Sequence, residues 1–178
     1  EYLFEGIGGV PELFKNRVVI PFEGHYEEFR HVIHHELTHA VMNDYMYGGS
    51  IQGLITGRIR VQIPGWVAEG LAEYESRYNT FDTQSDMFVR DAVVEGYLPP
   101  ISQLDGYPVY TAGPTIFRYM EEKYGKEKVG EFMTKLRVAG TTNSTFESTF
   151  GMKEEEFSEK WAMFQRKIYY PDISDMQS

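Results

Sequence analysis

The chain has 178 residues, a formal net charge of −10 at pH 7, 42% hydrophobic residues and no cysteine. This length and composition fit one domain with its own core, and the absence of cysteine excludes a disulfide framework, a thiol nucleophile and a cysteine-ligated metal site. The negative charge argues against nonspecific nucleic-acid binding, and no apolar run approaches the ~18 residues that a membrane span needs.

The first 25 residues favour a small region that contains a strand. The run VVIPF at 18–22 predicts a short strand, and Pro21 cannot donate a hydrogen bond to a neighbouring strand. We therefore expect this strand at the edge of a small sheet. A further strand is expected over residues 58–63, within a loop-like stretch that begins at residue 48.

The chain from residue 26 onward has a helical pattern. Apolar residues recur at spacings of three and four over residues 26–47, and Gly48 and Gly49 end this pattern. Ser144 and Glu147 have the spacing of a capping box, which predicts the start of a short helix. The other helices are expected over residues 64–78, 83–95, 112–124, 126–138 and 153–169.

The sequence shows no internal repeat and no boundary between domains. We expect one domain over residues 1–170, with a strand-bearing part at 1–25 and a helical part at 26–170. Residues 171–178 are polar and resemble a tail or a linker. Because residue 1 is Glu rather than Met, we expect the chain to be a piece of a longer protein with additional domains.

The motif HELTH at 35–39 lies within the first predicted helix. His35 and His39 are four residues apart, so their imidazoles lie on one helical face and can reach one ion at ~2.0–2.1 Å. Glu36 is offset by one residue, which places its carboxylate beside the ion, where it can accept a proton from water. The motif therefore indicates a zinc site with a general base.

Glu69, on the second predicted helix, is the candidate third ligand, because a catalytic zinc needs three protein ligands and one open position. Gly70 costs roughly 1 kcal/mol inside a helix, so we expect it to let this helix approach the first one closely. Glu73 lies one turn after Glu69. It can orient a ligand histidine, and it can equally be a solvated carboxylate.

Two segments carry a specific resemblance to a known clan. The run HELTHAVMNDY at 35–45 is similar to the active-site helix of thermolysin, and WVAEGLAEY at 66–74 resembles the third-ligand helix of thermolysin-like and aminopeptidase-type gluzincins. Weaker similarities follow at 110–125 and 146–161. The chain thus resembles the gluzincin clan of zinc metallopeptidases, and within it the peptidase-MA-like family.

This resemblance implies a mostly helical α+β fold of the zincin type, with an active-site helix, a third-ligand helix and a small N-terminal sheet with an edge strand. It implies one Zn²⁺ per chain, bound by His35, His39 and Glu69, with Glu36 as the general base. Tyr110 best matches the family's tyrosine that stabilises the oxyanion, and Tyr107 is the nearby competitor.

The implied function is hydrolysis of peptide bonds in a peptide or protein substrate. Glu69 lies farther from His39 than the third ligand does in thermolysin, so residues 48–63 resemble an insertion. No segment resembles the GAMEN motif of aminopeptidases, which favours an endopeptidase. The alternatives are an inactive zinc-binding interaction module (a pseudoprotease), a zinc hydrolase for a non-peptide amide, and a purely structural helical domain.

Other features have simpler interpretations. His31, His35 and His39 form a stripe, but one straight helix does not easily wrap three ligands around one ion. His25 and His34 are expected to be surface histidines or histidines with satisfied hydrogen bonds, and Met42, Met46 and Phe88 are expected in the core rather than on a binding surface. The expected edge strand is either scaffold or a pairing site for substrate. The resemblance favours a secreted or cell-envelope location, which the sequence itself does not give.

Overall fold

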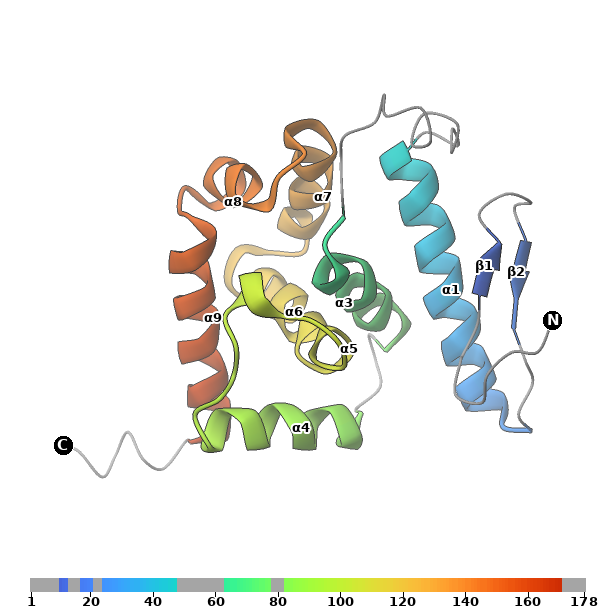
Figure 1. The fold of residues 1–178 in the computed structure, drawn as a ribbon, viewed down its shortest axis with the longest axis horizontal. Coiled ribbons are helices and arrows are strands. Elements are labelled where there is room, and N and C mark those ends of the chain that lie inside the picture. Colours follow the sequence, from blue (N-terminus) through green and yellow to red (C-terminus); the bar gives the residue numbers. More distant parts are fainter. Residues whose placement is uncertain (1–9, 13–16, 21–23, 48–62, 78–81, 171–178) are drawn as a thin grey trace.

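A computed structural model describes residues 10–12, 17–20, 24–47, 63–77 and 82–170 (Figure 1). The chain begins with β1 (Val10–Glu12), β2 (Arg17–Val19), α1 (Tyr26–Tyr47), α3 (Gly65–Ser76), α4 (Thr83–Val94) and the 3-10 turn η1 (Ile101–Gln103). It continues with α5 (Pro108–Thr111), α6 (Gly113–Tyr124), α7 (Glu127–Ala139), α8 (Thr142–Phe150) and α9 (Glu154–Tyr169).

The described chain is a helical domain, so the expected α+β class with an edge-strand sheet is wrong. Within the described ranges the only strands are β1 and β2, three residues each, which pair antiparallel with Val10 opposite Val19. A two-stranded hairpin of this size cannot form a layer of a domain. Of the apolar run at 18–22, only Val18 and Val19 belong to β2, which ends at Val19. Residues 21–22 and 58–62 of the expected strands lie outside the described residues.

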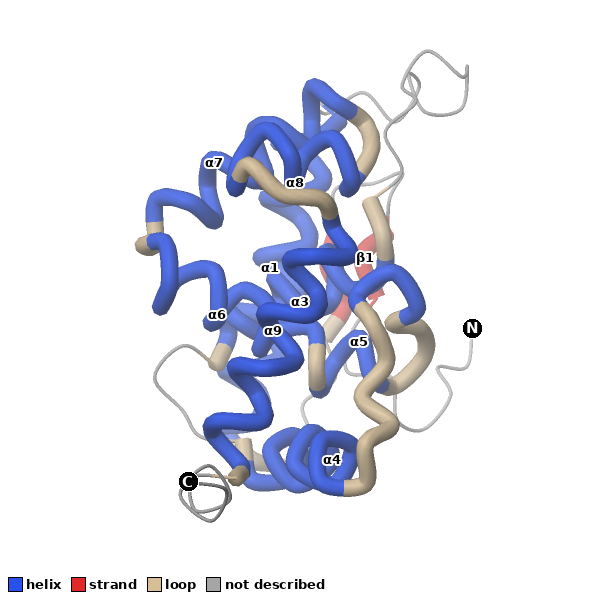
Figure 2. The backbone as a smooth tube through the Cα atoms, turned by 90° about the vertical axis from the view of Figure 1, so that its left-hand side faces the viewer, coloured by secondary structure: helices blue, strands red, loops and turns tan. Residues whose placement is uncertain are grey.

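Of the two helices that carry the motifs, α3 lies at the centre of the fold and α1 lies at its edge (Figure 1). Helix α3 packs against both α1 and α6, and the hairpin lies beside α1 on the side facing away from α3 (Figure 1). In the view of Figure 2, α4 lies at one end of the molecule and α7 and α8 at the other. None of the described helices combines the length and apolar character needed to cross a membrane.

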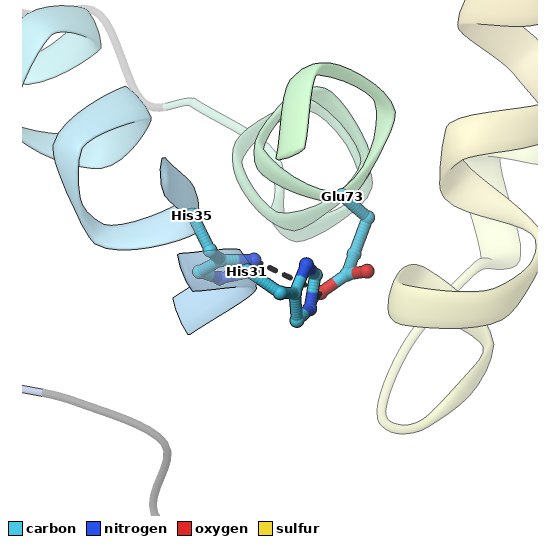
Figure 3. A group of neighbouring side chains, drawn as sticks. All are labelled: His31, His35 and Glu73. Atoms are coloured by element: carbon cyan, nitrogen blue, oxygen red, sulfur yellow. Dashed lines mark ion pairs between the residues drawn. The ribbon is translucent and has the colours of Figure 1, made fainter. Parts of the chain in front are cut away.

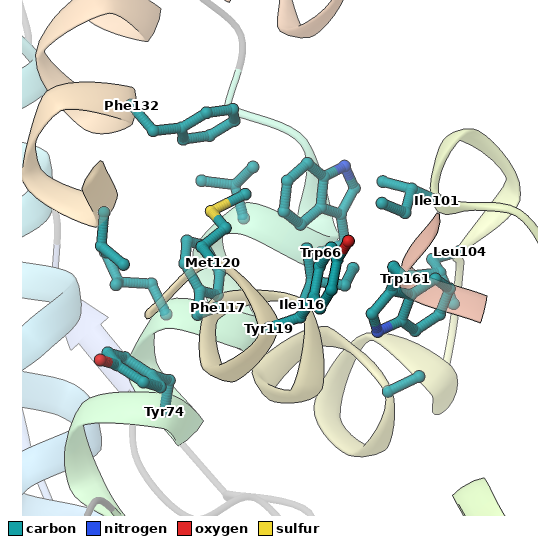
Figure 4. Packing of buried hydrophobic residues seen from close by; sticks show 14 of the residues in the cluster. Trp66, Tyr74, Ile101, Leu104, Ile116, Phe117, Tyr119, Met120, Phe132 and Trp161 are labelled. Carbon is teal, nitrogen blue, oxygen red and sulfur yellow. The ribbon is translucent and has the colours of Figure 1, made fainter. Parts of the chain in front are cut away.

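The largest fully buried side chains of the core are aromatic and come from α3, α6, α7, α8 and α9. Trp66 packs between Phe117 and Phe132, with ring centroids at 5.8 and 6.0 Å (Figure 4). Phe146 contacts Phe157 at 4.7 Å and is fully buried. Removing such a ring typically costs about 3–5 kcal/mol. This packing holds one face of α3 against the core, and another face of α3 contacts α1.

Helix boundaries follow the expected ones with local exceptions. The helix expected over 112–124 is preceded by the separate turn α5, and its first residues are Gly113 and Pro114. The expected capping box at Ser144 does not start a helix, because α8 begins at Thr142 with Thr141 as its N-cap residue. At α4 the side chain of Asp82 accepts hydrogen bonds from the backbone of Gln84 and Ser85, as an N-cap should.

The partner of Gly70 also differs from the expectation. Its close neighbour is Gly113 of α6, and not a residue of α1. A Cβ at Gly70 would lie 2.8 Å from the carbonyl carbon of Gly113. Glycine at this position therefore brings α3 onto α6, while α1 meets the other side of α3.

Candidate metal and catalytic centre

Helices α1 and α3 bring three of the predicted residues together. The Nε2 atoms of His35 and His39 are 3.0 Å apart. Glu69 Oε2 lies 3.1 Å from Nε2 of His39 and 3.3 Å from Nε2 of His35. The two histidine side chains are 12% exposed and that of Glu69 is 24% exposed, so the group lies at the edge of the protein and is open on one side.

The donor atoms of this group fit a small cation. Tetrahedral coordination at ~2.0–2.1 Å separates neighbouring ligand atoms by about 3.3–3.4 Å. The three observed separations of 3.0–3.3 Å are close to that value. Two imidazole nitrogens and one carboxylate oxygen are also a ligand set that catalytic zinc uses. The chemistry and spacing of these residues therefore suit a zinc ion.

Glu36 is buried directly beside this group. It is 5% exposed, and within the described part of the chain its Oε2 atom has no hydrogen-bond partner. Buried carboxylate oxygens without a partner are costly, so they usually have a functional reason. A water molecule or a substrate group in the open position would supply the missing partner.

Glu73 holds His35 from behind. Its Oε1 atom lies 2.9 Å from Nδ1 of His35 and 3.4 Å from Nε2 of His31 (Figure 3). Arg77 donates a hydrogen bond from Nε to the other carboxylate oxygen at 3.0 Å. Glu73 is 9% exposed, which rules out a solvated carboxylate. A carboxylate behind a ligand histidine fixes the orientation of its ring.

His31 does not join the other two histidines around one centre. Its ring centroid is 6.1 Å from that of His35, and its Nε2 atom faces Glu73. The three-histidine site is therefore not formed. His25 and His34 are exposed, as expected.

The carboxylates and imidazoles of the group shift each other's proton affinities. Burial lowers the pKa of His35, but the close contacts with the Glu69 and Glu73 carboxylates and their charges outweigh burial and raise it to about 9. Burial raises the pKa of Glu69, but His35 and His39 lower it to about 2. Burial likewise opposes the effect of His31 and His35 on Glu73, whose pKa lies well below its usual range. Without a metal, the group is thus a network of ion pairs.

Tyr110 reaches the group from α5, which packs against α3. Its ring stacks on that of His35 with centroids 6.5 Å apart and planes at 17°. Burial raises the pKa of Tyr110, and the charge of Glu69 and a hydrogen bond to it raise it further. Tyr107 instead packs edge-on against Phe88 at 4.9 Å. Of the two candidate tyrosines, the structure places Tyr110 at the centre.

His31 and Arg77 both support Glu73, and the motifs alone did not assign them this role. His31 precedes His35 by four residues, and Arg77 follows Glu73 by four, so each lies one turn from a residue of the group. Both contact Glu73. The i, i+4 spacing that identified the histidine pair thus also points to its support.

Comparison with known proteins gives one match. Residues 2–167 match the model of the peptidase MA superfamily. The matched range contains α1, α3 and α5, and therefore the whole group of His35, His39, Glu69 and Tyr110. No curated protein and no solved structure matches the chain. Because the family match covers most of the sequence, this chain belongs to the peptidase MA superfamily.

Proposed function

We propose that this chain is a zinc-dependent metallopeptidase that cleaves bonds within peptide or protein substrates. His35, His39 and Glu69 would hold one zinc ion per chain. One observation carries the proposal: three ligand atoms converge to 3.0–3.3 Å beside the buried carboxylate of Glu36, whose Oε2 has no partner among the described groups. Membership of the peptidase MA superfamily supports it.

Bound zinc would supply a Lewis acid that polarises a carbonyl group and lowers the pKa of water. Glu36 would take the proton from the attacking water and pass it to the nitrogen of the leaving amine. This role agrees with a buried carboxylate, one residue after His35, whose Oε2 has no hydrogen-bond partner among the described residues. The carboxylate is regenerated when the amine leaves.

Tyr110 would donate a hydrogen bond to the carbonyl oxygen of the substrate as negative charge develops on it. Its phenol is protonated near neutral pH, because the ordinary pKa of a tyrosine is 10 and the surroundings raise it further. A protonated phenol next to the ligand group is a donor of the type that stabilises an oxyanion. Glu73 would keep the ring of His35 in the orientation that presents Nε2 to the ion.

The first test is the zinc content of the purified protein, measured by elemental analysis after dialysis. We expect about one zinc per chain, lost in the double variant His35→Ala/His39→Ala. A protein that neither contains zinc nor takes it up on titration would contradict the metal site.

The second test is peptide hydrolysis by Glu36→Gln. This variant keeps the shape of the side chain but loses the base, so it should bind zinc and cleave casein or a peptide library at less than a hundredth of the rate. Glu28→Gln is the matched control, because Glu28 lies on the same helix and is exposed. Full zinc occupancy with no new internal amino termini in the wild-type digest would instead support the inactive zinc-binding module.

A further inference from the structure

A row of charged groups runs from the start of α4 to the proposed zinc ligand His35. Asp82 Oδ2 lies 3.5 Å from Nε of Arg77, at the end of α3. The same Nε donates a hydrogen bond to Glu73 Oε2 at 3.0 Å. Glu73 Oε1 lies 2.9 Å from Nδ1 of His35 (Figure 3). Carboxylate, guanidinium, carboxylate and imidazole therefore follow one another from α4 to the ligand group.

The side chain of Asp82 is fixed by the first turn of α4. Its Oδ1 atom accepts hydrogen bonds from the backbone N–H groups of Gln84 and Ser85, at 3.1 and 3.2 Å. Its Oδ2 atom accepts a hydrogen bond from Ser85 Oγ at 2.7 Å, and this is the oxygen that faces Arg77. The N-cap contacts thus hold the carboxylate in place, and Arg77 meets a preformed partner.

Helix α4 is itself held by its neighbours. Val89 and Val93 are buried in the core, whereas Phe88, which was expected in the core, is exposed. The hydroxyl of Tyr169, on α9, donates a hydrogen bond to Oδ1 of Asp86 at 2.8 Å. The start of α4 is therefore a firm support rather than a mobile end.

The contacts between these groups are partly shielded from water. The side chains of Glu73, Arg77 and Asp82 are 11%, 25% and 19% exposed. Together with Tyr110 they line a narrow cavity of about 30 Å³, which has room for about one water molecule. Exposed ion pairs contribute little because water and salt screen them, and this screening is weaker here.

Arg77 needs such a support. Its long side chain has many rotamers, and ordering it on Glu73 alone costs conformational entropy. Among the described residues, Asp82 is the second carboxylate within 4.0 Å of the guanidinium. A guanidinium between two fixed carboxylates keeps one orientation, and the Glu73 carboxylate then keeps its own.

We propose that Asp82 is a positioning residue for the zinc site, acting through Arg77 and Glu73. This proposal rests on the proposed function, in which His35 binds zinc, and it extends the support of that ring to the N-cap residue of α4. Loss of a carboxylate directly behind a ligand histidine typically weakens metal binding 10- to 100-fold. Asp82 acts at two removes, so we expect a loss of about 3- to 10-fold.

The test is a double-mutant cycle on metal affinity. Asp82→Asn removes the charge that faces Arg77 but keeps an N-cap, because Asn caps helices as well as Asp does. Titration with Co²⁺, followed by its visible absorption, and zinc competition with a chromophoric chelator measure the affinities. We expect Asp82→Asn to weaken both metals about 3- to 10-fold and to alter the Co²⁺ spectrum, with an unchanged far-UV circular dichroism spectrum. In the Arg77→Met background it should have no further effect, because the row of contacts is already interrupted.

Asp86→Asn is the matched control, because Asp86 lies one turn further along α4 and lines the same cavity, but its partner is Tyr169. It should keep the wild-type metal affinity. Wild-type affinity in folded Asp82→Asn, or an equal loss with and without Arg77→Met, overturns the positioning role and leaves the proposed function standing. A wild type that shows the coupling but cleaves no peptide rejects the proposed function and supports the role of Asp82. A wild type that takes up neither metal rejects both.

Discussion

Gly70 of α3 and Gly113 of α6 touch through their backbones. A Cβ at Gly70 would lie 2.8 Å from the carbonyl carbon of Gly113, and a Cβ at Gly113 would lie 2.9 Å from Cα of Gly70. Glu69 directly precedes Gly70 in the sequence. The same helix is also held by Trp66, whose ring packs against Phe117 in the aromatic core. The position of the third proposed ligand therefore depends on two glycines that carry no chemistry of their own.

Gly70→Ala should destabilise the protein by about 1–3 kcal/mol, because the added methyl group forces two helix backbones apart. Gly130→Ala on α7 is the control, since a Cβ there meets nothing within 4 Å. In that helix the same substitution should stabilise by up to about 1 kcal/mol. Urea denaturation of both variants measures the difference. Equal effects at the two positions would refute the packing role of Gly70.

Removing the metal should reveal a pH dependence that originates at His35. Its folded pKa is about 9, above the ordinary 6.5, because the Glu69 and Glu73 carboxylates outweigh burial. Protonated His35 therefore stabilises the metal-free protein through its ion pairs with Glu69 and Glu73. This stabilisation is fully present below pH 6.5 and is lost as the pH rises through 9. Zinc competes with the proton on His35, so zinc affinity should rise over the same interval.

Thermal unfolding of the chelator-treated protein between pH 5.5 and 9.5 tests this dependence. His35→Gln should remove most of it, and His34→Ala, at an exposed position on the same helix, should leave it unchanged. A melting temperature of the metal-free wild type that does not fall over this interval would contradict the ion-pair network.

Glu73→Gln should weaken zinc binding by about 10- to 100-fold, because the amide holds the ring of His35 less firmly than the carboxylate does. His31→Ala should have a smaller effect in the same direction, since His31 contacts the same carboxylate oxygen at 3.4 Å. Competition with a chromophoric chelator measures both affinities. Glu75→Gln, two residues after Glu73 on the same helix, serves as the comparison. Wild-type affinity in Glu73→Gln would show that Glu73 has no positioning role.

The local parts of the centre could be predicted from sequence because they depend on helix geometry alone. The spacing of His35 and His39 fixes their shared face, and α1 has the bounds that the apolar pattern predicted. The approach of Glu69 to His35 and His39 depends on packing between helices. Periodicity does not predict such packing, and the family resemblance indicated Glu69 as the third ligand instead. The two residues that support Glu73 needed the structure, although their spacing was visible.

The errors arise where tertiary context decides between equal local patterns. A five-residue apolar run such as 18–22 suits a strand of a large sheet and a three-residue hairpin strand equally well, and the described structure has the latter. Phe88 and Val89 are adjacent, and the sequence does not say which one faces the core. The choice between α1 and α6 as the partner of Gly70 was likewise a question of packing.

Tyr110→Phe should lower kcat by about 10²- to 10³-fold with little change in KM or zinc content, because it removes one hydrogen-bond donor and keeps the ring that stacks on His35. The loss belongs to kcat since the hydrogen bond strengthens only as charge develops on the substrate oxygen. Tyr107→Phe is the control, because it keeps the ring that packs against Phe88 and removes only the hydroxyl of the competing tyrosine. Steady-state kinetics on one cleaved peptide should therefore show near wild-type kcat for Tyr107→Phe. The reverse ranking of the two variants would transfer the oxyanion role to Tyr107.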